Sequence, residues 1–202
     1  MRYIASMETV TVGLGFVGSE RGRIAALYWE AFGRKLRPGF TNEAIGQAAV
    51  KSGLRSDRMF VARRGATVLG ICGFCDIDAG AVDLTWSSLR QTLSISASLR
   101  AGISLVALAR VPRAESLVLD GLCVDSAARG LGVGTALLNA ATNYALQDGK
   151  QSISLSVIDN NPRARALYER LGFTSVDGGS LGLLSAVYGF ASYTTMELEV
   201  NK

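Results

Sequence analysis

Leu122-Cys-Val-Asp125-Ser-Ala-Ala-Arg129-Gly-Leu-Gly132-Val-Gly134-Thr135 is the stretch of this 202-residue sequence that decides its fold. It ends a run, rich in β-branched and apolar side chains, that predicts a strand over 115–124. It also opens a helix predicted over 133–147, which ends at Asp148-Gly149. Backbone N–H groups can converge at successive glycines, and a helix start carries a partial positive charge. The stretch therefore favours either a diphosphate site or a tight strand-to-helix turn without a ligand.

The residues after this helix complete a β-α-β unit. Residues 151–158 alternate between polar and apolar side chains, as a half-buried strand does. Pro162 suits the first turn of a helix predicted over 162–171, and Gly172 suits its end. We expect the last strands at 173–176 and 193–200, with a loop over 177–192 between them.

The N-terminal half predicts a different order of elements. It reads, in order, as a strand over 7–12, a helix from Ser19 to about Leu36, a helix over 42–52 and a hairpin of strands over 58–63 and 67–76. Residues 81–110 carry leucines at loosely helical spacing, which predicts one or two helices there. We therefore expect one mixed α/β domain over residues 1–202, with a helical insertion at about 81–110.

Charge and hydropathy exclude several classes of protein. The net charge is +4, from 21 basic and 17 acidic residues, and no basic run forms a stripe, so we expect no nucleic-acid partner. Glu8 interrupts the apolar N-terminus, which argues against a secretory signal. Arginines at 90, 100 and 110 interrupt the most apolar stretch, which argues against a membrane span. We expect a cytoplasmic protein.

The three cysteines indicate free thiols, and the sequence has no histidine. Cys72 and Cys75 form a C-x-x-C pair with no second pair to complete a zinc site, so we expect buried apolar packing and no metal.

A second glycine loop offers a rival interpretation. Gly13-Leu-Gly15-Phe-Val-Gly18 matches the G-x-G-x-x-G pattern of a dinucleotide site, after a strand and before a helix. A NAD-dependent oxidoreductase would need a second parallel strand ending in an acidic residue about 20 residues on. The chain after Leu36 predicts a helix and then a hairpin, so this alternative is remote, and a flexible turn is the simpler interpretation.

Two motifs resemble those of the GNAT (GCN5-related N-acetyltransferase) superfamily. The strand end at Leu122–Val124 followed by Arg129-Gly-Leu-Gly132-Val-Gly134 resembles motif A, R/Q-x-x-G-x-G/A. The second stretch, Asp159-Asn-Asn161-Pro-Arg-Ala164-Arg-Ala-Leu-Tyr168-Glu-Arg-Leu-Gly172-Phe173, resembles motif B. The resemblance is sharp over about 115–176, loose over 1–80 and absent in detail over 81–110.

The resemblance implies a mostly antiparallel mixed sheet, flanked by helices and splayed between its fourth and fifth strands. It implies an acyltransferase that takes acetyl-CoA as cosubstrate and transfers the acetyl group, by direct attack, to a primary amine of a small molecule or peptide. An acyl-CoA-binding sensor without turnover stays open as the alternative. We also expect no membrane partner, and we keep a homodimer as an open alternative.

The same resemblance assigns roles to residues of the two motifs. The cofactor-binding set that it implies is Leu122, Cys123, Val124, Arg129, Gly130, Leu131, Gly132, Val133, Gly134, Thr135, Asn161, Ala164 and Tyr168. Tyr168 would also be the general acid that protonates the departing thiolate. Arg163 and Arg165 could reach phosphates or lie solvated on the surface.

The two motifs say less about the residues that would bind the acceptor amine. We expect Asp120, on the strand face of Leu122 and Val124, to act as base or to hold the amine, with Glu115 as second choice. The apolar side chains of Trp86, Tyr188 and Phe190 either line the acceptor pocket or pack in the core. A nucleophilic Cys123 is disfavoured because no histidine can activate it.

Overall fold

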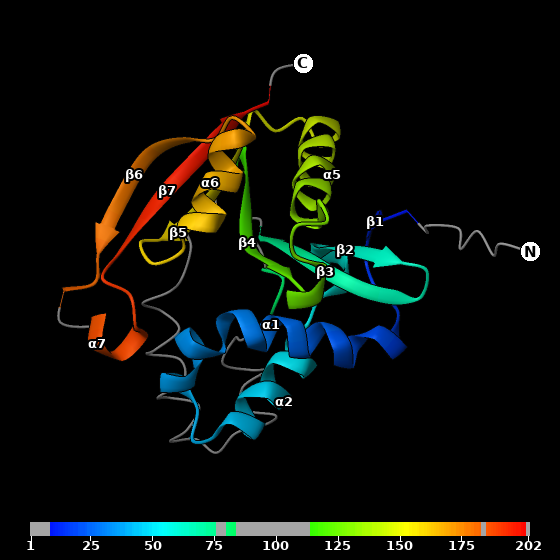
Figure 1. The fold of residues 1–202 in the computed structure, drawn as a ribbon, viewed down its shortest axis with the longest axis vertical. Helices are drawn as coiled ribbons and strands as arrows, with labels where there is room; N and C mark the ends of the chain where they lie inside the picture. The colour runs from blue at the N-terminus through cyan, green and yellow to red at the C-terminus, as the bar shows by residue number, and fades with distance from the viewer. Residues whose placement is uncertain (1–8, 76–79, 84–113, 183–184, 201–202) are drawn as a thin grey trace, which may run out of the picture.

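The fold is a seven-stranded mixed sheet with helices on both faces (Figure 1). The computed structural model describes residues 9–75, 80–83, 114–182 and 185–200. The strands are β1 (Thr11–Leu14), β2 (Met59–Arg64), β3 (Thr67–Cys75), β4 (Ser116–Val124), β5 (Ser152–Ile158), β6 (Thr174–Ser180) and β7 (Ser192–Glu199). The α-helices are α1 (Arg21–Leu36), α2 (Glu43–Gly53), α5 (Val133–Gln147), α6 (Pro162–Arg170) and α7 (Ser185–Tyr188).

The sheet has the strand order β1-β2-β3-β4-β5-β7-β6. Every described pair of neighbouring strands is antiparallel except β4 and β5. That parallel pair is short: it runs from Ser116 opposite Ser152 to Val118 opposite Ser154. Beyond these residues, β4 continues to Val124 and β5 continues to Ile158, but the two strands no longer pair with each other. They therefore diverge. The fold class predicted from the sequence, including the splay between the fourth and fifth strands, is confirmed.

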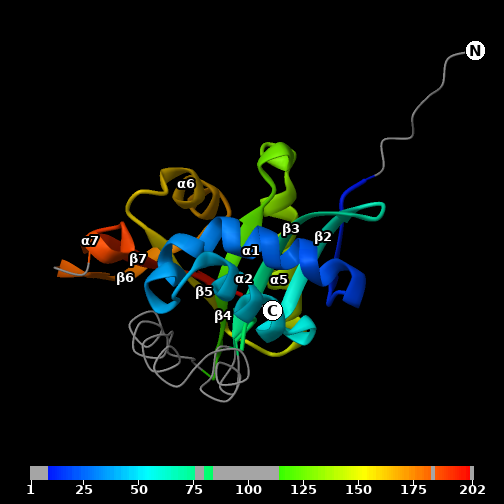
Figure 2. The same cartoon turned by 90° about the horizontal axis from the view of Figure 1, so that it is seen from below.

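Two apolar clusters hold the helices against the sheet. α1 and α2 pack on one face, through side chains such as Ile24 and Val50, against Ile71 and Cys123 of the sheet. α5 and α6 pack on the other face. Their cluster contains Leu137, Leu138, Ala141, Tyr168, Leu117, Leu155 and Met196. Figures 1 and 2 show α1 and α2 on the opposite side of the sheet from α5. Burial of these faces is the main favourable contribution to folding.

Most predicted elements are present with ends shifted by a few residues. The helix over 133–147 has the predicted bounds, and Asn42 caps α2 by accepting a hydrogen bond from Ile45 N at 2.9 Å. The predicted strand over 7–12 lies at Thr11–Leu14. The loop over 177–192 was wrong in part: β6 extends to Ser180 because it pairs along β7, and α7 fills part of the remainder.

The dinucleotide alternative is wrong for this fold. β1 pairs antiparallel with β2, so no parallel strand follows α1 to complete a dinucleotide site. Most of the helical insertion predicted over 81–110, from residue 84 on, lies outside the described residues.

Candidate functional site

The divergence of β4 from β5 leaves an edge of β4 open. Asp125 N donates to Leu69 O of β3 at 2.8 Å. Backbone groups of successive residues point to opposite edges of an antiparallel strand. The N–H and C=O groups of Val124 and Leu122 therefore point away from β3, toward β5, while those of Cys123 face Ile71 of β3. Of the three strand residues predicted to bind the cofactor, only Leu122 and Val124 therefore have backbone groups that are directed away from β3.

β5 presents a matching edge. Asp159 N donates to Ser192 O at 3.0 Å, on the β7 side. By the same alternation, the backbone groups of Ile158 and Ser156 point toward β4. Two strand edges thus face each other beyond the last paired residues, Val118 and Ser154. An extended molecule that carries amide groups can pair with such an edge as an added strand.

The glycine loop lies where the open edge of β4 ends. Gly130 and Gly132 have φ values of +84° and +77°, which favour glycine. The first hydrogen bond of α5 runs from Ala136 N to Gly132 O at 2.9 Å. The amides of Val133, Gly134 and Thr135 precede that bond and have no intrahelical acceptor. With the helix dipole, these amides form a site suited to a phosphate.

Gly134 meets a second requirement, which is close helix packing. A Cβ at Gly134 would lie 3.0 Å from Leu167 Cδ2 of α6 and 3.9 Å from Leu122 Cδ2 of β4. A larger residue would push α6 away from α5, so the two motifs identified in the sequence are in direct contact.

Asn161 and Tyr168 lie at opposite ends of α6. Asn161 is the N-cap: its Oδ1 accepts from Ala164 N at 3.2 Å. Tyr168 is 7% exposed, and its ring lies 5.9 Å from that of Phe173. Tyr168 belongs to the apolar cluster between α5 and the sheet, and Ala164 packs against that cluster.

The two arginines of α6 differ in their contacts. Arg165 pairs with Glu169 at 3.0 Å. Its guanidinium also donates hydrogen bonds to the hydroxyls of Thr194 on β7 and Ser175 on β6, so these exposed contacts fix its position. Arg163 is exposed at the start of the helix. Of the two, Arg163 is the better candidate for a phosphate contact.

A β-bulge interrupts β4 at Asp120. Gly121 pairs with Gly73 of β3, whereas the next paired residue of β4 is Leu119, opposite Phe74. Asp120 is therefore the extra residue. A bulge bends its strand and breaks the alternation of side chains.

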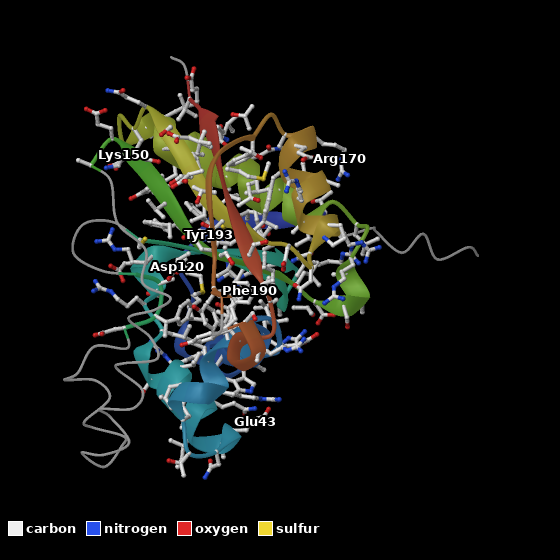
Figure 3. All side chains as sticks on the ribbon, turned by 90° about the vertical axis from the view of Figure 1, so that its left-hand side faces the viewer. Glu43, Asp120, Lys150, Arg170, Phe190 and Tyr193 are labelled. Carbon is white, nitrogen blue, oxygen red and sulfur yellow. The ribbon has the colours of Figure 1, made fainter. Side chains whose placement is uncertain are left out.

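The bulge moves Asp120 to the other face of β4. The side chains of Leu122 and Val124 face α5, each 3.9 Å from the Cβ position of Gly134. Asp120 Oδ2 lies 3.1 Å from the Cβ position of Gly80, whose neighbour Ala81 packs in the α1 cluster. The prediction that Asp120 shares a face with Leu122 and Val124 is wrong, because strict alternation assumes an unbroken ladder. Figure 3 labels Asp120 on the side of the sheet toward α1.

Glu115, the second candidate base, lies at the other end of β4. It precedes Ser116, where β4 and β5 pair, and its carbonyl accepts from Gln151 N at 2.8 Å. The open edge begins only beyond Val118, so Glu115 is remote from it along the strand.

The cysteines are buried and poorly suited to nucleophilic chemistry. Burial, with a smaller contribution from the Asp120 carboxylate, raises the pKa of the Cys72 thiol to about 12. Burial likewise raises the pKa of the Cys123 thiol well above its usual value. Both thiols stay protonated at neutral pH. The described part of the chain contains no group of three His, Cys, Asp or Glu residues that could hold a metal ion.

The segment around α7 closes against α1. Tyr188 and Phe190 are buried, and Lys35 Nζ of α1 lies 5.1 Å from the Phe190 ring centroid. Asp159 Oδ2 anchors the segment by accepting from Ala191 N at 3.2 Å and Ser192 N at 3.1 Å. The ring of Phe190 thus packs against α1, and Figure 3 shows Phe190 near this helix, whereas Tyr188 is buried. Trp86 lies outside the described residues.

Sequence reasoning missed the contacts that α1 makes with the glycine loop. Arg23 pairs with Asp125, and Glu30 Oε1 lies 3.8 Å from Arg129 Nη2. Their spacing shows that Arg23 and Glu30 share one helix face, but no feature of the sequence indicates which segment that face meets.

The mixed sheet diverges at the single described parallel pair, and the glycine loop at the start of α5 adjoins this opening. The family model described as "Acetyltransferase (GNAT) family" matches residues 23–173. The chain therefore belongs to the GNAT family of acetyltransferases.

Curated relatives match about a third of the chain. The chain is 42% identical over 67 residues to a mycothiol acetyltransferase of Beutenbergia cavernae, covering 33% of this chain and 23% of that protein. It is 36% identical over 66 residues to the uncharacterized N-acetyltransferase MJ1207 of Methanocaldococcus jannaschii, covering 33% of this chain and 29% of that protein. The chain thus spans less than a third of the length of these relatives.

Solved structures share the fold along most of the chain. An N-acetyltransferase from Staphylococcus aureus Mu50 has a TM-score of 0.70 at 16% identity, covering 93% of this chain and 100% of that chain. The ribosomal-protein-S18-alanine N-acetyltransferase from Escherichia coli has a TM-score of 0.58 at 14% identity, covering 96% of each chain. Among the described residues, we find no helix with the length and apolarity that a membrane crossing requires.

Proposed function

We propose that this protein is an acetyl-CoA-dependent N-acetyltransferase that acts on a primary amine of a small molecule or peptide. One observation carries the proposal: the open edge of β4, at Leu122 and Val124, leads through a single short turn into the glycine loop at Arg129–Thr135. An acyl-CoA has the matching order of groups, with amides in its pantetheine arm followed by a diphosphate.

The chain's own residues supply the contacts for this cosubstrate. The backbone of Leu122 and Val124 pairs with the pantetheine amides, and the first-turn amides of α5 hold the diphosphate. The side chains of Thr135 and Arg163 can add contacts to phosphate oxygens. Asn161 can reach the arm through the side-chain amide nitrogen, because its Oδ1 already caps α6.

The reaction that fits this site is direct transfer. The neutral amine nitrogen attacks the thioester carbonyl carbon, a C–N bond forms, and the C–S bond breaks as the tetrahedral intermediate collapses. The coenzyme A thiolate takes a proton from Tyr168, and the amine loses its proton to a carboxylate or to water. An unpaired β4 amide near Val124 can stabilise the oxyanion, and positioning supplies much of the rate.

Asp120 remains the candidate base, now from the α1 side of the sheet. The bulge directs its carboxylate away from α5 and α6, so the amine would approach from the face opposite Tyr168. An acid and a base on opposite faces can serve the leaving thiolate and the attacking amine separately.

The proposed acceptor is a primary amine, and it can belong to a small molecule or to a peptide. The names of the similar proteins include a mycothiol acetyltransferase and a ribosomal-protein-alanine N-acetyltransferase, so small-molecule and peptide acceptors both belong in the first screen. An acyl-CoA-binding module without turnover is the second candidate, because the same edge and loop would serve binding alone.

Two measurements test the proposal in order. Titration calorimetry should detect binding of acetyl-CoA and no binding of NADH; absence of acetyl-CoA binding by folded protein would refute the proposal. Thiol release should then rise above the hydrolytic background when a panel of amines and short peptides is added. Binding without amine-dependent release from any acceptor would favour the binding module.

A further inference from the structure

One face of α1 is attached to the segment that leads from β4 into the glycine loop. Arg23 and Glu30 are seven residues apart, two helical turns, and so lie on the same side of α1. Arg23 Nη2 pairs with Asp125 Oδ2, and Glu30 lies 3.8 Å from Arg129. The two ends of the segment 125–129 thus meet the same helix face.

Asp125 is the centre of this contact. Its Oδ1 accepts from Ala127 N at 2.8 Å and so caps the short 3-10 turn at Ser126–Ala128. Its backbone N donates to Leu69 O of β3. Its Oδ2 takes the Arg23 guanidinium. Asp125 therefore joins the sheet, through its backbone N–H, to the turn and α1, through its carboxylate, at the point where the chain enters the glycine loop.

The turn is also held by the buried side chain of Ala128 and by hydrogen bonds from Ala128 N to Asp125 O and from Leu131 N to Ala128 O, whereas its other residues are open to solvent. Ser126 and Ala127 are exposed, and Gly130 and Gly132 follow with open space around their Cβ positions. A glycine-rich segment loses much conformational freedom when it is ordered. A loop that is already held at Asp125 has less to lose when a diphosphate binds.

We propose that Arg23 is a positioning residue of the cofactor loop: through Asp125 it preorders residues 125–132 for the diphosphate of an acyl-CoA. The ligand assignment rests on the proposed function, whereas the ordering of the loop does not. Arg23 contacts neither the reacting thioester nor the amine. Loss of Arg23 raises the KM for acetyl-CoA and its Kd about three- to tenfold and leaves kcat within about twofold, since the diphosphate is remote from the reacting carbonyl.

The test compares Arg23→Met, Arg23→Lys and a matched control, Arg37→Met. Arg37 also forms an exposed ion pair, with Glu43 of α2 at 2.9 Å, but it lies at the C-cap of α1, seven residues beyond Glu30. Arg23→Met keeps the apolar stem and removes the charge, and Arg23→Lys should restore part of the affinity. The control should bind acetyl-CoA as the wild type does.

A second variant shows whether Arg23 acts through Asp125. Asp125→Asn keeps an oxygen for the Ala127 N–H and removes the charge. In the Asp125→Asn background, Arg23→Met should change the Kd for acetyl-CoA by less than about 1.5-fold, because the shared interaction is already gone. If Arg23→Met raised the Kd for acetyl-CoA by the same factor in the Asp125→Asn background as in the wild type, the proposal would be overturned.

Hydrogen exchange of the ligand-free protein separates this proposal from the proposed function. Peptides covering 125–132 should exchange at least about threefold faster in Arg23→Met than in the wild type or Arg37→Met. Failure of the wild type to bind acetyl-CoA would refute the proposed function but would leave this measurement intact. Unchanged exchange over 125–132 would overturn the role of Arg23, whatever the chain binds.

Discussion

Gly134 of α5 and Leu167 of α6 are in such close contact that a Cβ on Gly134 would lie 3.0 Å from Leu167 Cδ2. Gly134 belongs to the glycine loop and Leu167 to the motif that carries Tyr168. The packing of one glycine therefore sets the distance between the helix that would hold the diphosphate and the helix that carries the candidate acid.

Replacing Gly134 with valine should destabilise the protein by about 1–3 kcal/mol, because the added atoms overpack the α5–α6 contact. Chemical denaturation measures the change. The double variant Gly134→Val/Leu167→Ala removes the colliding atoms and should recover part of the loss; a larger loss in the double variant would contradict this account.

Replacing Gly132 with alanine should weaken acetyl-CoA binding by at least about tenfold, because a residue with Cβ resists the φ of +77° that directs the loop amides. The matched control is Gly149→Ala, at the other end of α5, which has a φ of +71° and equally open surroundings. Calorimetry should show that both variants lose similar stability but that only Gly132→Ala loses affinity. Equal affinities would mean that the loop amides do not hold the ligand.

Tyr168→Phe should lower kcat about 100-fold and leave the Kd for acetyl-CoA nearly unchanged, because it removes the proton donor and keeps the ring packed against Phe173. Tyr144→Phe serves as control, since Tyr144 lies in an aromatic cluster with Phe60 and Phe74. A kcat for Tyr168→Phe within threefold of the wild type would remove Tyr168 as the acid.

Cys123→Ala should retain acyl transfer, with kcat within about threefold of the wild type. Burial raises the pKa of this thiol well above its usual value, so a thiolate nucleophile is not formed at neutral pH. Thiol release measures the rate, and mass spectrometry after rapid quenching should detect no acetylated protein. Loss of activity with an intact fold would instead indicate a covalent acyl-enzyme.

Stability should depend on pH through Glu20 and Arg63. The Arg63 guanidinium, 2.6 Å from Glu20 Oε1, lowers the pKa of Glu20 from about 4.5 to about 2. A lowered pKa stabilises the folded state above pH 4.5, and this contribution disappears as the pH falls toward 2. Glu20→Gln should therefore reduce the free energy of unfolding by about 1–2 kcal/mol at pH 7, after allowance for solvent screening.

Denaturant titrations between pH 3 and 7 give the comparison for Glu20. The gap between wild type and Glu20→Gln should narrow steadily below pH 4.5. Glu169→Gln, which breaks the exposed pair with Arg165, should show a smaller gap at every pH. A constant gap for Glu20→Gln would show that its effect is not electrostatic.

The sequence by itself determined the order of most elements, because their causes are local. The glycines at 130 and 132 marked the turn before α5, Asp148-Gly149 marked the end of that helix, and Pro162 marked the first turn of α6. The two motifs at 122–135 and 159–173 carried the family, since both depend on spacings of a few residues along the chain.

The tertiary structure alone decided the geometry of the candidate site. The bulge at Asp120 reversed the face on which this carboxylate lies, because alternation depends on a ladder that β3 supplies from elsewhere in the chain. The strand that extends to Ser180 forms because β7 pairs along it. The contact between Arg23 and Asp125, 102 residues apart, depends on how α1 packs on the sheet. Local spacing can specify a turn or a helix face, but the partner of that face is chosen by packing between distant segments.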